Sequence, residues 1–253
     1  DVSQAGDDNT ATVKQTGDSN DNTVTQEGDS NTALSKVPGN NNDVSQEQYG
    51  DGNVAESYVR SDENSLWQDQ GYNDAWDGPT YNSYMKAVQK GGNGNELLQQ
   101  QHGATDASGI ARQNGQDNWG WQLQYDTGNS AYLLQKGDGH SAWQQQQGAN
   151  NDVSTKQFGE NQRATTNQDG EGNEAVVRQE WRDNVADGSF GSLPENAEVP
   201  DNINFGVTQL GTDGYASLAQ TGVENHAAIY QGEASIGNEA YLNQAGHRTN
   251  GLL

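Results

Sequence analysis

The sequence contains no cysteine, so neither disulfide bonds nor thiolate metal sites can stabilise its fold. Basic residues are scarce as well: 12 Lys and Arg stand against 36 Asp and Glu, which gives a formal net charge of -24 and a pI near 4.1. A chain with this charge repels nucleic acid and anionic membrane surfaces, so neither is expected as a partner. The chain also lacks any run of about eighteen apolar residues, and we do not expect it to be embedded in a membrane.

Hydrophobic residues make up only 30% of the 253 residues, and the mean hydropathy is -1.06. These two values alone favour disorder. Six Trp and ten Tyr oppose it, and the charged fraction is only 19%, because most polar positions are Asn, Gln, Ser, Thr or one of 32 Gly. Such a composition is typical of a low-complexity tract, a prion-like segment or a repeat fold with a polar interior.

A repeat of eleven residues decides between these classes. Its unit is Gln-x-Gly-x-x-Asn-x-Ala-x-Val-x, and residues 15–20 (QTGDSN) and 26–31 (QEGDSN) show its beginning twice in succession. Columns of Gln, Gly and Asn stay in phase over seven consecutive units, which chance does not explain. The residues predicted to stack in these columns are Gln4, Gln15, Gln26, Gln113, Gln124, Gln135, Gln146, Gln157, Gln168, Gln179, Gln209, Gln220 and Gln231, with Asn9, Asn20, Asn31, Asn53, Asn118, Asn129, Asn151 and Asn173.

Within each unit the marked residues alternate, as in Asn129, Ala131, Leu133 and Gln135, and two residues is the period of a β-strand. The Gly-Asp-Ser-Asn stretches between them are turn sequences. Each unit therefore predicts one strand and one tight arc, and two units make a coil of 22 residues. We predict an all-β solenoid of two-strand coils in which Gln stacks on Gln and Asn on Asn. A string of β-hairpins is disfavoured, because every unit repeats the same inward set at the same phase.

We predict a single solenoid over residues 1–253 with two irregular insertions. The phase of the repeat slips near residues 71–100 and breaks again near 187–206, where Pro194 and Pro200 occur. Because proline cannot donate to a strand ladder, the second insertion is predicted to be a loop that bulges from one arc.

The motif Gln-x-Gly-x-x-Asn-x-Ala-x-x-x-Gln resembles the curlin repeat of bacterial curli subunits. Residues 168–179 match it in full, and the resemblance covers most of the chain outside the two irregular stretches. It implies a β-solenoid that is secreted across the outer membrane and polymerises into functional-amyloid fibres of the extracellular biofilm matrix at the cell surface. It also implies a nucleating subunit and an outer-membrane secretion channel as partners. The resemblance is to the major subunit, although a nucleating minor subunit shares the same repeat.

The repeat independently predicts self-assembly. A solenoid ends in open strand edges with unpaired N–H and C=O groups, and we expect no capping helix at either end. A head-to-tail contact between such edges does not close and grows into a filament. We therefore expect a structural fibre subunit and no enzyme. The alternatives are a monomeric solenoid adhesin, an ice-binding protein and a polysaccharide-acting enzyme. The last two are less well supported, because outward Thr are scattered and only the second insertion could build a cleft.

No catalytic residue, cofactor-binding residue or metal ligand is assigned from the sequence. Arc carboxylates such as Asp18 are interpreted as solvated turn residues, although stacked arc carboxylates suit Ca²⁺, which prefers oxygen ligands. His140 is interpreted as a substitute in an Asn column. Trp121 and Trp143 lie 22 residues apart at an outward position and are predicted to stack as an exposed aromatic ladder. This ladder either protects the sheet or contacts other filaments or glycan.

Overall fold

The computed structural model describes residues 1–253 except 72–77, 183–184, 187–205, 224 and 233–235. The described residues contain strands and no helix. The strands are β1 (Val2–Ala5), β2 (Thr10–Thr16), β3 (Asp21–Glu27), β4 (Thr32–Pro38), β5 (Asp43–Tyr49), β6 (Val54–Val59), β7 (Ser65–Gln70), β8 (Tyr84–Lys90), β9 (Glu96–Thr105), β10 (Ser108–Asn114), β11 (Trp119–Thr127), β12 (Ser130–Asp138), β13 (Ser141–Ala149), β14 (Asp152–Glu160), β15 (Arg163–Glu171), β16 (Glu174–Arg182), β17 (Val185–Ala186), β18 (Val207–Gln209), β19 (Tyr215–Val223), β20 (His226–Gln231), β21 (Glu239–His247) and β22 (Asn250–Leu252).

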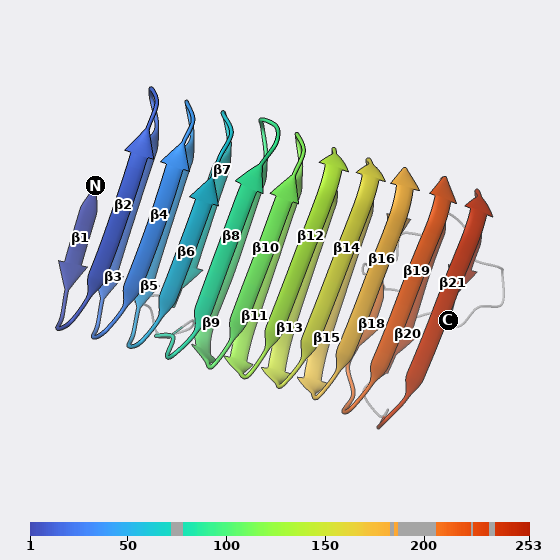
Figure 1. The fold of residues 1–253 in the computed structure, drawn as a ribbon. Coiled ribbons are helices and arrows are strands. Elements are labelled where there is room, and N and C mark those ends of the chain that lie inside the picture. The colour runs from blue at the N-terminus through green and yellow to red at the C-terminus, as the bar shows by residue number, and fades with distance from the viewer. Residues whose placement is uncertain (72–77, 183–184, 187–205, 224, 233–235) are drawn as a thin grey trace.

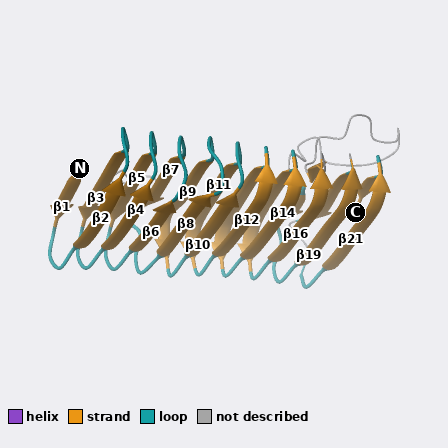
Figure 2. Ribbon diagram, turned by 45° about the horizontal axis from the view of Figure 1, so that its top comes forward, coloured by secondary structure: helices purple, strands orange, loops and turns teal. Residues whose placement is uncertain are grey.

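The strands form two parallel sheets that lie face to face and are joined by arcs along both edges (Figures 1 and 2). Sheet A has the order β1-β3-β5-β7-β9-β11-β13-β15-β17-β20-β18, with β22 beside β20. Sheet B has the order β2-β4-β6-β8-β10-β12-β14-β16-β19-β21. Where the repeat is regular, paired residues lie 22 apart, as in Gln113 with Gln135. The predicted β-solenoid of 22-residue coils is confirmed. The hairpin alternative is wrong, because hairpin strands are antiparallel.

Burial alternates along the strands and separates a core face from a solvent face. In β3, Asn22, Val24 and Gln26 are buried, and the residues between them are not. The buried side chains point between the two sheets, where Ala, Val and Leu form two apolar clusters among the inward glutamines. The period of two in the sequence therefore gives each sheet one inward and one outward face.

Glycine is required in the arcs because neighbouring coils approach each other closely there. Gly137 has a φ of +124°, and a Cβ at this position would lie 1.8 Å from the carbonyl oxygen of Gly159 in the next coil. Two residues after an arc glycine the backbone enters the left-handed region, as at Asp8 (φ 56°), Ser19 (φ 55°) and Ser30 (φ 61°). Short polar side chains such as Asp and Asn tolerate that region best, which explains the Gly-Asp-Ser-Asn pattern.

The first insertion is narrower than predicted. Strands β8 and β9 occupy residues 84–90 and 96–105 and keep the ladder register, so most of the range 71–100 is regular. The extra residues lie in the connection between β7 and β8, since Gln70 pairs with Gln101 at a separation of 31 residues. Part of this connection, 72–77, lies outside the described residues.

The second insertion falls within a strand and not at an arc as predicted. Both β17 and β18 pair with β15, through Arg163 with Val185 and Thr166 with Val207. The chain therefore leaves sheet A in the middle of one strand position and resumes the same register afterwards. The intervening residues 187–205, which include Pro194 and Pro200, lie outside the described residues.

Candidate functional site: amide ladders and strand edges

A continuous column of glutamine amides runs inside the solenoid along sheet A. Each Nε2 donates a hydrogen bond to the Oε1 of the glutamine in the next coil, at 2.7–3.0 Å. All members except the first are buried. The column consists of Gln4, Gln26, Gln48, Gln70, Gln101, Gln124, Gln146, Gln168, Gln209 and Gln231.

Sheet B carries a second column with the same direction of donation, at 2.9–3.0 Å. Its members are Gln89, Gln113, Gln135, Gln157, Gln179, Gln220 and Gln244. Gln15, which was predicted to stack on glutamine, does not join it. Its neighbour in the next coil is Val37, and its Nε2 donates to the backbone oxygen of Asn20 at 2.6 Å. Val37 and Val59 interrupt the column, and the Oε1 of Gln89 is buried without a hydrogen-bond partner.

The second Nε2 hydrogen of these amides bridges the two sheets. Gln135 Nε2 donates to the carbonyl oxygen of Trp119 at 2.8 Å, and Gln146 Nε2 donates to that of Ser130 at 3.0 Å. One amide thus bonds to the coil before it, the coil after it and the opposite strand. A buried amide without such partners costs on the order of 1–3 kcal/mol. The stack of coils is what makes a glutamine-rich interior stable.

A third glutamine column, which the sequence analysis missed, lies in sheet A two residues before the first. It consists of Gln46, Gln68, Gln99, Gln122 and Gln144, with bonds of 2.7–2.9 Å. It ends where Gln144 Nε2 donates to Thr155 Oγ1 at 2.9 Å. These glutamines occur only in alternate units, so a search at a period of eleven does not find them, whereas a search at the coil period does.

The asparagine columns bind mainly the backbone. The N–H of Asn151 donates to Asn129 Oδ1 at 2.9 Å, its Nδ2 donates to the carbonyl oxygen of Gly170 at 3.0 Å, and its Oδ1 accepts from the N–H of Asn173 at 3.0 Å. These bonds tie the start of each strand to the arcs of both neighbouring coils. The predicted members with an Oδ1 that accepts from the next coil in this way are Asn9, Asn20, Asn31, Asn53, Asn118, Asn129, Asn151 and Asn173.

His140 takes the place of an asparagine in one of these columns, as predicted. Its N–H donates to Asn118 Oδ1 at 3.0 Å, and its Nδ1 accepts from the N–H of Gln162 at 3.3 Å. Burial lowers the pKa of His140 below its ordinary value of 6.5, because the imidazolium would be poorly solvated there. The neutral ring therefore works as a hydrogen-bonding spacer in the column.

The aromatic residues predicted to stack do so on the outer face of sheet A. The rings of Trp121 and Trp143 lie 5.4 Å apart and 9° from parallel, and Trp119 meets Trp121 edge-on at 6.3 Å. Trp121 Nε1 also donates to Gln100 Oε1 at 2.9 Å. Both stacked rings are half-buried, so they are less exposed than predicted.

Neither a metal cluster nor a membrane-spanning helix occurs in the described part of the chain. Its described residues contain no group of three or more His, Cys, Asp or Glu side chains placed to hold a metal ion, and calcium binding by the arcs stays a prediction. They also contain no helix long and apolar enough to cross a membrane.

At each end of the described stack, strands have a neighbour on one side only. β1 and β2 pair with β3 and β4, while β21 and β22 pair with β19 and β20. The sheet A column begins with the acceptor Oε1 of Gln4 in the edge strand β1. It ends at Gln231 in β20, which has β22 as a further neighbour and whose Nε2 donates to the carbonyl oxygens of Tyr215 and Asn238 at 3.0 Å. The sheet B column ends at Gln244 in the edge strand β21, whose Nε2 donates to the carbonyl oxygen of His226 at 2.9 Å. Both ends of the described stack are therefore open strand edges, and one ladder amide, Gln4 or Gln244, lies in an edge strand at each end.

Comparison with known proteins agrees with this arrangement. The family model of the curlin associated repeat matches three segments, residues 1–28, 17–50 and 148–180. No curated protein matches the chain. The matched segments contain the Gln, Gly and Asn columns described above, and the family suggests a curli-type fibre subunit. Residues 1–50 and 148–180 of this chain are therefore similar to the curlin associated repeat.

Proposed function

We propose that this protein is the major structural subunit of a curli-like functional-amyloid fibre in the extracellular biofilm matrix. The observation that carries the proposal is the open strand edge at each end of the described stack, where β1 and β2 at one end and β21 and β22 at the other have a neighbour on one side only. The three matches to the curlin associated repeat support it independently.

Assembly proceeds by head-to-tail addition of strands. The strand edges at the β1 and β2 end of an incoming copy add to those at the β21 and β22 end of the filament, so that backbone N–H and C=O groups pair as they do between coils. No covalent bond forms or breaks, and we assign no catalytic role to any residue. The contact is heterologous and does not close, which produces a filament.

The proposed partners follow from the family resemblance. They are further copies of this chain, a nucleating subunit that presents the first edge, and an outer-membrane channel through which the unfolded chain is secreted. The protein then acts at the cell surface as a fibre.

The first test follows the chain after it is desalted from denaturant. We expect thioflavin fluorescence to rise, electron microscopy to show filaments, and fibre diffraction to show a meridional reflection near ~4.8 Å. A β-rich chain that stays monomeric would contradict the fibre and favour the monomeric adhesin.

A second test blocks one edge without unfolding the solenoid. The N–H of Thr10 donates to the carbonyl oxygen of Asn31, directly before β4, and hydrogen-bonding residues alternate along a parallel strand, so the N–H of Val13 points to the open edge. By the same alternation, Val24 bonds to Asp1, and the N–H of Val2 points outward. The variant Val2→Pro/Val13→Pro removes one outward donor from each edge strand and places a proline ring at the edge, and it is expected to stay folded and stop elongation. Val2→Ala/Val13→Ala, which keeps both donors, is the matched control and should still elongate.

A further inference from the structure

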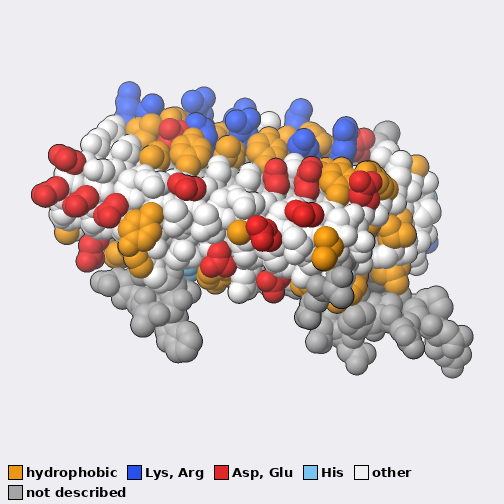
Figure 3. Space-filling model, turned by 90° about the horizontal axis from the view of Figure 1, so that it is seen from below, with side chains coloured by type: hydrophobic (Ala, Val, Ile, Leu, Met, Phe, Trp, Pro, Cys, Tyr) orange, Lys and Arg blue, Asp and Glu red, His pale blue; other side chains and the backbone are white. Residues whose placement is uncertain are grey.

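The outer faces of the two sheets carry opposite charge over the first half of the solenoid. Strands β2, β4, β6, β8 and β10 of sheet B present the cations Lys14, Lys36, Lys86, Lys90 and Arg112, with Arg60 directly after β6. One carboxylate, Glu56, shares these described strands, and it pairs with Lys86 at 2.6 Å. Figure 3 shows the Lys and Arg side chains gathered along one long edge of the molecule.

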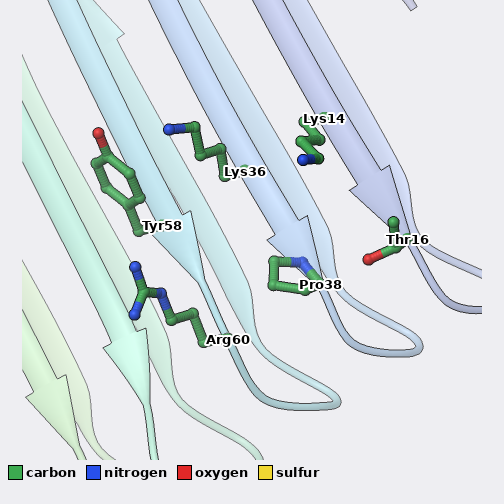
Figure 4. Close-up of a pocket in the computed structure, with 6 residues that line it drawn as sticks. All are labelled: Lys14, Thr16, Lys36, Pro38, Tyr58 and Arg60. Atoms are coloured by element: carbon green, nitrogen blue, oxygen red, sulfur yellow. The ribbon is translucent and has the colours of Figure 1, made fainter.

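The basic face contains a groove that lacks a counter-charge. It has a volume of about 400 Å³ and is lined by Lys14, Lys36 and Arg60, from three successive coils, together with Thr16, Pro38 and Tyr58 (Figure 4). No lining residue is acidic. The Lys36 ammonium lies 5.2 Å from the centre of the Tyr58 ring, so the cation is held over an aromatic surface.

The opposite face is the chemical complement of this one. In the described strands β1, β3, β5, β7 and β9 of sheet A, the solvent-facing charged residues are Asp21, Glu27, Asp43, Glu47 and Glu96, without any Lys or Arg, while Asp69 is buried with its Oδ2 3.1 Å from His102 Nε2. Burial, and then the nearby charge of Asp69, raise the pKa of the Glu47 carboxyl group.

The fold brings the two charged faces into register between translated copies. The end of a sheet B strand and the start of the next sheet A strand flank the same arc, as Lys90 and Glu96 do. We consider a second copy that is displaced through the thickness of the solenoid with its axis unchanged. This displacement sets Glu96 opposite Lys90 and Ser65 opposite Arg60, and Asp43 lies beside Ser65 at one strand spacing of ~4.8 Å. Further along, the Trp121–Trp143 stack of one copy faces the sheet B cations of the other, which suits cation–π contact.

We propose that the outer face of sheet B binds the outer face of sheet A in a second, parallel copy of this chain. The contact is lateral, uses neither open edge, and joins filaments into bundles, so in that form it rests on the proposed fibre. Because face A meets face B, the contact is heterologous and extends to further copies.

The available area is sufficient. Strands of seven residues at ~3.3 Å per residue, stacked over the five oppositely charged positions at ~4.8 Å, give a face of roughly 550 Å². Two such faces bury roughly 1,100 Å², above the ~1,000 Å² that a biological interface should exceed. The net charge of -24 on each copy opposes approach at long range, but at about 0.15 M salt screening limits this repulsion to ~8 Å, and the matched pairs dominate at contact.

The test reverses the charge of two residues on each face in turn. Preformed filaments are then examined by electron microscopy and low-speed sedimentation. Variant B is Arg60→Glu/Lys90→Glu, and variant A is Asp43→Lys/Glu96→Lys. Each alone is expected to form filaments and to lose the bundles that the wild type forms, because like charges then meet. Mixing filaments of variants A and B is expected to restore bundles, since the glutamates of variant B face the lysines of variant A.

The control Asp7→Lys/Asp18→Lys changes the net charge as variant A does, but in exposed arcs, and should bundle like the wild type. Equal bundling by variants A and B and the wild type would overturn the proposal, and so would a mixture that stays dispersed. Wild-type filaments that bundle only after a polyuronate is added would also overturn it, and would assign the basic face to an acidic polymer. A failure to form filaments at all contradicts the proposed fibre instead.

Discussion

A buried glutamine is stable inside this solenoid because its amide forms hydrogen bonds to both neighbouring coils and to the opposite sheet. Gln135 accepts from Gln113 and donates to Gln157 and to the backbone of Trp119. The adjacent Lys136 points outward and is exposed. The two neighbouring positions therefore separate a ladder role from a surface role.

The variant Gln135→Ala leaves the amide groups of Gln113 and Gln157 without their partner. We expect a loss of roughly 1–3 kcal/mol in the free energy of unfolding, whereas Lys136→Ala should change it by about 0.5 kcal/mol or less. Urea titration of the freshly desalted chain, followed by far-UV circular dichroism, measures both. Equal losses, or equal fibrillation rates, would contradict the assigned facing of these residues.

His140 gives the solenoid a dependence on pH. The unfolded chain takes up a proton at the ordinary pKa of 6.5, while burial delays this in the folded chain to lower pH. Protons therefore favour the unfolded state, and stability falls as the pH drops below 6.5 until the lowered folded pKa is reached. His140→Asn restores the column residue and should lose less stability between about pH 7.5 and pH 5.5. If the urea midpoints of His140→Asn and the wild type change with pH in the same way, His140 does not cause the pH dependence.

At the scale of the elements, the sequence analysis predicted strands, arcs and coil length correctly because one rule acts on every unit. A period of two places Val24 and Gln26 inward together, and glycine recurs where neighbouring arcs approach closely, as at Gly137. The repeat did not predict features that depend on which single residue occupies the facing position in the next coil. The isolation of Gln15 depends on Val37 in the next coil, and the strand position of the second insertion depends on how Val185 and Val207 pair with β15.

The arcs offer a direct test of close backbone approach. Gly137→Ala and Gly237→Ala both place a side chain at positive φ, which costs roughly 1–2 kcal/mol. Only at Gly137 does the new Cβ also meet a carbonyl oxygen of the next coil, since nothing lies within 4 Å of that of Gly237. We expect Gly137→Ala to lower the urea midpoint clearly more than Gly237→Ala. Similar urea midpoints would mean that neighbouring arcs move apart to accept the new Cβ without a loss of stability.

At the scale of the whole molecule, assembly brings together particles of the same sign. Each copy carries a net charge of -24, so an incoming subunit is repelled by the filament end that it must join. Added salt screens this repulsion. We expect the elongation rate of seeded filaments to rise several-fold as NaCl increases from about 0.02 M to about 0.3 M. A rate that is independent of salt would show that edge pairing alone controls growth.

The stacking of coils also sets how densely charge is packed along the fibre axis. Ten coils at ~4.8 Å carry the charge of -24, which gives one net charge per roughly 2 Å of length. Duplex DNA carries one per about 1.7 Å and holds a condensed layer of counterions for that reason. A fibre of these subunits is therefore a polyelectrolyte of nearly the same strength, and a matrix built from it would behave as an ion-exchange material that concentrates dissolved cations around the cell.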